Sequence, residues 1–544
     1  MEEWWRKAVV YQVWPRSFQD TDGDGVGDLP GVLSRLDHLS DLGVDVLWLS
    51  PVYPSPQVDS GYDISDYQDV DPLFGTLADL DALIHGLHSR GMRLVLDMVL
   101  NHTSDRHPWF LDSRASRDSP KRDWYWWRPP REGSAPGAPD AEPNRWGSMF
   151  SGSAWELDEP TGEYYLHTFA RQQPDLNWEN PEVRAAISAM LRWWLERGVD
   201  GFRLDVISMI SKKADDLLGF GPQLHDYLQE MHRDVFADRA LLTVGETPGI
   251  SVVEARRMTD PARNELDMVF EFEHVSLDQG ATKWDPQALS LPRLKRCFAR
   301  WQEGLADAGW NSLYWDNHDQ PRAVSRFGDP GRHRVASATT LATVLHLHRG
   351  TPFVYQGEEL GMVNAGFTSL AEYRDVESLN HYAQAVTAGQ PYAEVLTALR
   401  RMSRDNARTP VQWDDSPYAG FTTGEPWIAV NPDHGVVNAA AQRHDPQSAL
   451  AHYRRLIALR HDVPAVALGD FSLLLPDDEQ VWAFTRRHLD VELLVVANLS
   501  DREVSADVPD PGWAAAELLL GNLPGGPGGL RLRPWESRVL RRTH

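Results

Sequence analysis

The sequence predicts an α/β protein: a (β/α)8 TIM barrel with an excursion domain after its third strand and a C-terminal antiparallel β-domain. Eight short runs rich in β-branched and aromatic residues alternate with segments of helical periodicity, a pattern typical of parallel β/α units. Eight such units are the number that closes a barrel. The predicted strands are residues 8–18, 44–53, 92–102, 199–207, 241–247, 266–273, 311–319 and 350–359.

The connecting segments support this order. LADLDALIHGLHSRG (77–91) precedes the third strand and PEVRAAISAMLRWWLERG (181–198) precedes the fourth, and both have the apolar spacing of a helix that packs on a sheet. After about residue 465 the pattern changes to short strands such as VWAFTRR and LLVVANLS, which predicts a small antiparallel domain.

Two long stretches interrupt the alternation, one rich in Pro, Gly, Trp and Arg after the third strand and one after the eighth strand. Segments of this length are rarely plain connectors, and loops at the C-terminal face of a barrel usually build its site. The predicted division is barrel, first part (1–102); excursion domain B (103–176); barrel, second part (177–465), with a loop insertion at about 372–445; and C-terminal β-sandwich (466–544).

Composition narrows the classes of partner. The 544 residues carry a formal net charge of −26, from 53 Lys+Arg against 79 Asp+Glu, which disfavours nucleic acid and anionic membrane. The N-terminal stretch lacks the charge and hydropathy pattern of a signal peptide, and no apolar run has membrane-spanning length. The single cysteine, Cys297, suits a reducing compartment. We therefore expect a cytoplasmic protein, monomeric, that handles a small neutral molecule.

The fourth predicted strand, GFRLDVI (201–207), contains two charges in an apolar run. Residues two apart in a strand point to the same side, so Arg203 and Asp205 share one face near the end of the strand. An unpaired buried charge is costly, so the pair either forms a structural ion pair or serves chemistry.

Other predicted strands end in the same kind of residue: Asp97, Asn101 and His102 in the third, Glu246 in the fifth, and Asn317, His318 and Asp319 in the seventh. Acidic groups that converge at one rim repel each other, which raises some of their pKa values and creates an acid/base site. Retaining glycoside hydrolysis needs two close carboxylates, one to attack the anomeric carbon and one to protonate the leaving oxygen. A third would hold the sugar hydroxyls, and a neighbouring arginine would keep the nucleophile ionised.

Four motifs in this order, DMVLNH (97–102), GFRLDVI, VGET (244–247) and NHDQPR (317–322), resemble the α-amylase family of glycoside hydrolases, family 13. The resemblance runs from the first strand to the C-terminal domain. QPDLNW (173–178), EYRDVESLN (372–380) and RDNARTPVQW (404–413) are similar to the oligo-1,6-glucosidase and α-glucosidase branch. The resemblance to this branch implies an exo-acting retaining α-glucosidase that removes terminal glucosyl units from short neutral oligosaccharides.

The resemblance implies a role for each matching residue. Asp205 matches the nucleophile, Glu246 the general acid/base, and Asp319 the acid that stabilises the transition state. Residues that match the lining of the glucose subsite are Arg203, His102, His318, Phe150, Phe169 and Gln173. For each aromatic residue taken singly, plain core packing stays an alternative.

The resemblance also implies a blocked pocket. Asp59 and Tyr62, in VDSGYD, match a pair that closes the pocket, with Tyr62 as a stacking face and Asp59 as a carboxylate for the terminal hydroxyl. An arginine of RDNARTP would pair with Asp59; we favour Arg404, with Arg408 as the alternative. Val206, directly after the nucleophile, accompanies α-1,6 activity in this branch.

The loop DTDGDGVGD (20–28) has the alternating oxygens of a calcium loop around a glycine turn. The predicted ligands are Asp20, Asp22, Asp24, the Val26 carbonyl and Asp28, for a structural Ca²⁺ or Mg²⁺ far from the chemistry. An acidic glycine turn without metal is the alternative. Asn101, which helps to hold calcium in many amylases, is expected here to be a plain hydrogen-bonding residue.

Two rival functions share the predicted barrel. A sucrose isomerase or transglycosylase would use the same covalent intermediate with a different acceptor. The stretch after the fourth motif, PRAVSRFGD, is similar to the hydrolases rather than to the charged run of the isomerases. A non-catalytic relative, such as the anchored partner of an amino-acid transporter, would have lost the catalytic acids, whereas this sequence keeps all three.

Overall fold

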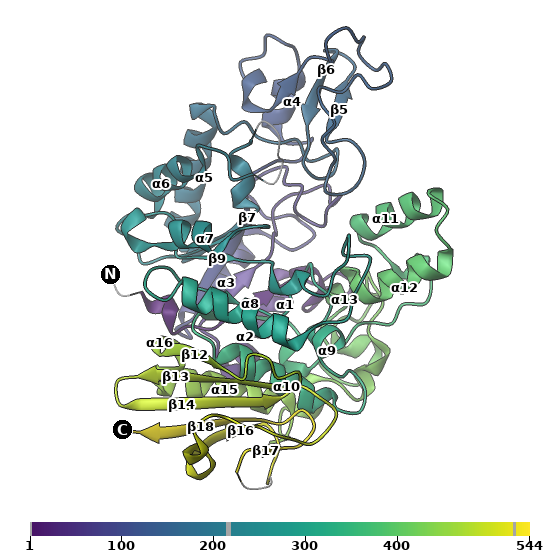
Figure 1. Ribbon diagram of the computed structural model, residues 1–544. Coiled ribbons are helices and arrows are strands. Elements are labelled where there is room, and N and C mark those ends of the chain that lie inside the picture. Colours follow the sequence, from purple (N-terminus) through teal and green to yellow (C-terminus); the bar gives the residue numbers. More distant parts are fainter. Residues whose placement is uncertain (1–2, 214–218, 526–528) are drawn as a thin grey trace.

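The computed structural model describes residues 3–213, 219–525 and 529–544, and it confirms the predicted fold class (Figure 1). Eight parallel strands form one sheet in the order β10-β11-β1-β2-β3-β7-β8-β9, and a parallel bridge between Val269 and Asn311 links the two ends. The barrel strands are β1 (Val10–Val13), β2 (Val46–Leu49), β3 (Arg93–Val99), β7 (Gly201–Asp205), β8 (Leu242–Glu246), β9 (Met268–Phe270), β10 (Ser312–Leu313) and β11 (Thr351–Tyr355).

Every barrel strand lies within a predicted run and is shorter than predicted, and the shortening occurs mainly at the carboxyl ends. Pro15 starts a 3-10 turn directly after β1, because proline has no N–H to donate to the ladder. After β10, the side chain of Asn317 accepts a hydrogen bond from the Asp319 N–H at 2.8 Å and turns the chain. Among the polar residues predicted to end the strands, Asp205 and Glu246 are the last residues of β7 and β8, and Asp97 lies within β3. The others lie in loops just beyond the ladder: Asn101, His102, Asn317, His318 and Asp319.

Helices cover the outside of the barrel, as the two quoted segments predict. α3 begins at a capping box between Thr76 and Asp79, and α5 begins at the Asn180 cap and ends at Gly198, whose φ of 109° requires glycine. The helices between barrel strands are α1 (Leu29–Ser34), α2 (Leu36–Leu42), α3 (Leu77–His88), α5 (Pro181–Arg197), α6 (Leu224–Met231), α7 (Val252–Thr259), α8 (Leu291–Gly304), α9 (Ala323–Phe327) and α10 (Arg334–His346).

The excursion domain after β3 projects above the barrel (Figure 1). It contains α4 (Pro108–Arg114) and a three-stranded antiparallel sheet in the order β4-β6-β5 (Trp127–Arg128, Glu163–Leu166 and Trp155–Asp158). A small apolar cluster of its own, which includes Trp155, Tyr164 and Leu166, holds the sheet together.

The insertion after β11 is largely helical. It contains α11 (Val376–Thr387), α12 (Tyr392–Met402), α13 (Asp405–Arg408) and α14 (Ala439–Gln442). α11 and α12 project beside the excursion domain, on the same side of the barrel (Figure 1). α15 (Ala449–Asp462) and α16 (Pro464–Leu468) then return the chain to the barrel.

The C-terminal strands form a five-stranded antiparallel sheet below the barrel, in the order β12-β13-β14-β18-β16 (Figure 1). Their bounds are β12 (Asp470–Leu474), β13 (Val481–His488), β14 (Val491–Asn498), β16 (Glu517–Gly521) and β18 (Ser537–Thr543), and β15 (Val504–Ser505) pairs with β17 (Arg531–Leu532) in a separate ribbon. Buried Lys295 of α8 fastens this sheet to the barrel by donating hydrogen bonds to the carbonyls of Leu475, Asp478 and Val481.

Across the three described ranges, no helix combines the length and the apolar composition that a membrane crossing requires.

Candidate active site

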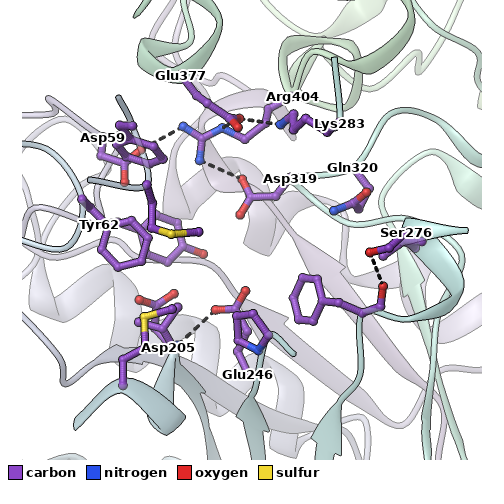
Figure 2. Close-up of a pocket in the computed structure, with 18 of the residues that line it drawn as sticks. Asp59, Tyr62, Asp205, Glu246, Ser276, Lys283, Asp319, Gln320, Glu377 and Arg404 are labelled. Carbon is purple, nitrogen blue, oxygen red and sulfur yellow. Dashed lines mark hydrogen bonds and ion pairs between the residues drawn. The ribbon is translucent and has the colours of Figure 1, made fainter. Parts of the chain in front are cut away.

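A pocket of about 320 Å³ opens at the carboxyl ends of the barrel strands, between the excursion domain and the insertion after β11. Ten of the predicted site residues line it: Asp59, Tyr62, His102, Phe150, Phe169, Asp205, Val206, Glu246, Asp319 and Arg404. Figure 2 labels Asp59, Tyr62, Asp205, Glu246, Asp319 and Arg404 among them. The acids predicted at the ends of the fourth, fifth and seventh strands therefore meet in one cavity.

Arg203 organises the floor of the pocket. Its Nη1 donates to Asp205 Oδ1 at 2.6 Å and to Asp97 Oδ1 at 2.8 Å, and its Nη2 donates to Glu246 Oε2 at 2.6 Å. All four residues are buried, and β3, β7 and β8 place them in neighbouring register, since Asp97 pairs with Arg203 across the ladder. One guanidinium thus aims two carboxylates that line the pocket.

The charge balance at this floor favours a bound proton. Burial raises the pKa of Asp205 well above its usual value, the charges of Glu246 and Asp97 add to the rise, and Arg203 opposes it. Three carboxylates around one guanidinium leave an excess of negative charge in a buried place, and one proton relieves it. Arg203 counteracts the rise without cancelling it, so an ionised nucleophile at Asp205, as the sequence predicted, requires the proton of the pair to lie on Glu246.

Val206, directly after Asp205, has a left-handed backbone with φ 35° and ψ 42°. A β-branched residue rarely adopts this conformation, which costs on the order of 1–3 kcal/mol. The strain coincides with a functional contact, because the Val206 N–H donates to Glu246 Oε2 at 3.1 Å while the Val206 side chain lines the pocket.

Asp319 lies opposite this floor (Figure 2). Its Oδ1 accepts from Arg408 Nη2 at 2.7 Å and from Arg404 Nη1 at 3.2 Å, and its Oδ2 lies 3.2 Å from His318 Nε2. Although burial opposes the shift, His318 and the two arginines hold the pKa of Asp319 well below its usual value. Asp319 therefore stays ionised and keeps its acceptor oxygens.

An ion pair closes one side of the pocket. Arg404 Nη2 lies 3.1 Å from Asp59 Oδ1, and Gln173 donates to Asp59 Oδ2 at 3.2 Å. Of the two arginines left open by the sequence, Arg404 lines the pocket, whereas Arg408 lies behind it at 1% exposure. Burial raises the pKa of Asp59 to about 6, against the opposing charges of Arg404 and Arg408.

Two groups of rings form the pocket walls and support them from behind: Tyr62, His102, Phe150 and Phe169 line the cavity, whereas Trp14 and His318 do not. Tyr62 stacks on His318 with ring centroids 5.3 Å apart, and Trp14 stacks on His318 at 5.1 Å. On the side of the excursion domain, Phe169 packs against His102 and Phe150 at 5.2 and 5.5 Å. Such flat apolar faces suit the C–H faces of a sugar ring.

Three residues predicted to bind substrate, Arg203, Gln173 and His318, lie directly behind the residues that line the cavity. Gln173 contacts Asp59 and His102, and His318 donates or accepts at the Tyr62 hydroxyl at 2.7 Å. In the structure these side chains hold the wall in place, and their contact with a sugar stays a prediction.

The structure adds two pocket residues, Lys283 and Glu377, and a residue behind the pocket, Asp375, that the sequence analysis did not assign to the site. Lys283 and Glu377 form an ion pair at 2.5 Å and are more exposed than Asp59 or Arg404. Asp375, deeply buried, accepts from Arg404 Nε at 2.9 Å and lies 3.4 Å from Arg408 Nη1. Asp375 and Glu377 belong to the quoted motif EYRDVESLN, so the motif carried a signal for both; Lys283 stands in a segment without one.

Asn101 is a plain hydrogen-bonding residue in this structure. The buried ammonium of Lys212 donates to Asn101 Oδ1 at 2.8 Å and to Asp175 Oδ2 at 2.5 Å. Because Asn101 follows β3 and Asp175 lies at the end of the excursion domain, the Lys212 ammonium links the barrel to the excursion domain. This contact agrees with the expectation that Asn101 is a hydrogen-bonding residue.

The acidic loop lies apart from the pocket. The carboxylates of Asp20, Asp22 and Asp28 converge within 4.8 Å of one another, and Asp24 lies outside this trio. Each of the three already accepts backbone N–H groups; Asp20, for example, binds those of Gly23 and Gly25 at 2.8 and 2.9 Å. Oxygen donors at this spacing fit a hard cation.

Comparison with known proteins agrees with this geometry. The family model described as the α-amylase catalytic domain matches residues 12–469. The chain belongs to the α-amylase family. An oligo-1,6-glucosidase from Parageobacillus thermoglucosidasius is 50% identical, with 99% of each chain covered, and a trehalose-6-phosphate hydrolase from Bacillus subtilis is 46% identical, with 99% of this chain and 98% of that protein covered.

Solved structures show the same relationship. The isomaltulose synthase from Klebsiella sp. LX3 superposes with a TM-score of 0.95, at 40% identity and 99% coverage of both chains. With the α-amylase catalytic domain over most of its length, the protein is a glycoside hydrolase.

Proposed function

We propose that the protein is an exo-acting, retaining α-glucosidase that removes terminal glucosyl units from short oligosaccharides, with a preference for α-1,6 bonds. The observation that carries the proposal is a pocket closed on one side by the Asp59–Arg404 ion pair, with Asp205 and Glu246 on its floor. A sugar chain cannot pass through a closed end, so a substrate enters with its non-reducing end first.

The contacts of Asp205 and Glu246 indicate which oxygen of each carboxylate acts in the first step. Arg203 engages Oδ1 of Asp205, which leaves Oδ2 to attack the anomeric carbon. Arg203 and the Val206 N–H both donate to Oε2 of Glu246, which leaves Oε1 to carry the proton to the leaving oxygen. The bond from the anomeric carbon to the leaving oxygen breaks as the bond to Asp205 forms.

In the second step a water attacks the glucosyl–Asp205 ester. Glu246, now ionised, takes the proton of this water, and the sugar leaves with the α-configuration that it had in the substrate. Asp319 accepts hydrogen bonds from ring hydroxyls as the ring flattens, and its low pKa keeps it an ionised acceptor, with Oδ2 free of the two arginines that bind Oδ1.

The preference for α-1,6 bonds rests on Val206. Its branched side chain lines the pocket directly beside both catalytic carboxylates, where it narrows the space for the leaving sugar. The more flexible α-1,6 bond tolerates this narrowing better than the α-1,4 bond of maltose. Similarity to the oligo-1,6-glucosidases of Parageobacillus thermoglucosidasius and Bacillus cereus, at 50% and 48% identity, supports the same preference.

Purified protein assayed on isomaltose, maltose and sucrose tests the proposal. We expect the highest kcat/KM on isomaltose, and α-glucose as the first anomer seen by proton NMR. β-Glucose as the first product would contradict the retaining mechanism, and a higher kcat/KM on maltose would contradict the α-1,6 preference.

Sucrose isomerisation is the second candidate, because isomaltulose synthases superpose on the chain with TM-scores up to 0.95. The arginines of the stretch PRAVSRFGD are engaged within the protein: Arg322 donates to the carbonyls of Gln356 and Ala407, and Arg326 binds Asp278 and Gln320. This supports hydrolysis over isomerisation. Isomaltulose as the main product from sucrose would favour the isomerase.

We also propose that the loop of residues 20–28 holds a structural Ca²⁺ or Mg²⁺, with Asp20, Asp22 and Asp28 as carboxylate ligands. The cation would stabilise the loop and its contact with the insertion after β11, where Thr422 donates to Asp20 Oδ2 at 2.5 Å. A monomeric state and a cytoplasmic location stay predictions from composition.

A further inference from the structure

The pocket wall formed by Phe150 is held from outside the pocket. Phe150 is buried, and its ring lies 5.1 Å from the guanidinium carbon of Arg404 and 5.5 Å from the ring of Phe169. It is thus a side chain of the excursion domain that contacts the ion pair which closes the pocket.

The turn that carries Phe150 is fastened at one side to its own domain. The Met149 N–H donates to the Thr168 carbonyl at 2.8 Å, and the Ser148 hydroxyl donates to the Phe169 carbonyl at 2.7 Å. Directly after Phe150, Ser151 has a φ of 79°, a conformation that costs energy in a residue other than glycine. A strained turn keeps its shape when surrounding contacts hold it.

Helix α11 supplies contacts at the other side. Asn380 Nδ2 donates to the Phe150 carbonyl oxygen at 3.1 Å, and Ser151 Oγ donates to Gln384 Oε1 at 3.0 Å. These two bonds join the excursion domain to the insertion after β11, two parts of the chain more than 200 residues apart.

The same helix also holds the opposite wall. Asp375 caps α11 by accepting the Ser378 N–H at 3.0 Å and also binds Arg404, while Glu377 lines the pocket. Residues 377, 380 and 384 are spaced i, i+3 and i+7, so they share one face of the helix. A single rigid element therefore sets the position of Arg404 and of Phe150, which contact each other.

We propose that Asn380 is a positioning residue for glucose recognition, which acts through the Phe150 carbonyl to press the Phe150 ring against Arg404. The inference rests on the proposed glucosidase function. It means that a side chain outside the pocket, Asn380, affects how tightly the pocket binds the terminal glucose. Loss of the Asn380 amide N–H lets the wall move away, which weakens binding of the terminal glucose more than it slows the chemical step.

The test compares Asn380→Ala and Asn380→Asp with wild type, in kcat and KM on isomaltose and in the inhibition constant for glucose. Aspartate keeps the shape of the side chain but replaces the N–H donor with an acceptor that faces a carbonyl oxygen. We expect both variants to raise KM and the glucose inhibition constant about fivefold to tenfold, with kcat changed less than twofold. Thr387→Ala, at an exposed position of the same helix whose hydroxyl bonds only to the Ala383 carbonyl, is the matched control and should stay within twofold of wild type.

A second comparison tests whether Asn380 acts through Phe150. In a Phe150→Ala background the ring is absent, so Asn380→Ala should raise KM by less than twofold further. Wild-type KM in Asn380→Asp, or a full additional loss in the Phe150→Ala background, would overturn the inference. If Asn380→Ala does not fold, Asn380→Asp decides alone, because it preserves the volume of an exposed residue. Absence of activity in wild type would instead refute the proposed function.

Discussion

The Arg203 guanidinium joins Asp205 and Glu246, with Nη1 to Oδ1 and Nη2 to Oε2 both at 2.6 Å. This contact fixes which oxygen of each carboxylate faces the reaction. It also explains why a strand with an otherwise apolar sequence carries an arginine two positions before an aspartate: the two side chains share one face, and the next strand places Glu246 within reach.

Glu246→Gln removes the proton donor while it keeps the hydrogen-bond partners of Oε2. We expect kcat/KM on isomaltose to fall by about 10³-fold or more, and that on 4-nitrophenyl α-glucoside to fall much less, because nitrophenolate leaves without a proton. Added azide should restore turnover on the nitrophenyl substrate and yield a glucosyl azide. Equal losses on the two substrates would argue against a role as acid.

Asp59 predicts a pH dependence of glucose binding. Its pKa of about 6 means that it takes a proton as the pH falls through 6, and a protonated Asp59 loses its charge toward Arg404 and its full capacity to accept a sugar hydroxyl. Affinity is therefore present above pH 6 and lost below it. We expect the inhibition constant for glucose to rise about tenfold from pH 7 to pH 5.

Asp59→Asn supplies the control for this profile. The amide cannot ionise, so the variant should bind glucose weakly at every pH. Its inhibition constant for glucose should not rise between pH 7 and pH 5. A wild-type profile in the variant would assign the titration to a different group.

Val206→Ala tests the origin of linkage preference. Removal of two methyl groups widens the space beside the catalytic pair, so the ratio of kcat/KM on maltose to that on isomaltose should rise about tenfold. The melting temperature should stay level or rise, because alanine is less strained than valine at a φ of 35°. An unchanged ratio of the two kcat/KM values would show that other residues of the pocket determine the linkage preference.

The proposed cation predicts a stability change on chelation. Exhaustive treatment with EDTA should lower the melting temperature by about 5 °C or more, and added Ca²⁺ or Mg²⁺ should restore it. Asp22→Asn should melt lower than wild type and respond little to EDTA. A wild-type melting temperature that chelation leaves unchanged would contradict the cation site.

The barrel could be predicted from sequence because its signals are local. Strand and helix periodicity needs about ten residues, and carboxyl ends of parallel strands meet at one face of a barrel, so Asp205, Glu246 and Asp319 are expected to lie together. The pairing of Asp59 with an arginine 345 residues away came from motif similarity, and only the three-dimensional fold distinguishes Arg404 at the pocket from Arg408 behind it.

The rest depends on long-range contacts that leave no periodic signal. The insertion after β11 lacked a predicted shape, yet its α11 positions Arg404 through Asp375 and Phe150 through Asn380. Lys283 shows the same limit, because an isolated lysine in a loop has no local pattern that indicates a partner such as Glu377.

The proposed mechanism depends above all on the attack of Asp205 on the anomeric carbon of a single glucosyl unit held in this pocket. Incubation with 5-fluoro-α-glucosyl fluoride, followed by proteolysis and mass spectrometry, detects this step, because the fluorine slows hydrolysis of the ester and lets the intermediate accumulate. We expect one glucosyl label per chain, on the peptide that contains Asp205. A label on another carboxylate, or turnover that leaves every peptide unlabelled, would show that Asp205 is not the nucleophile.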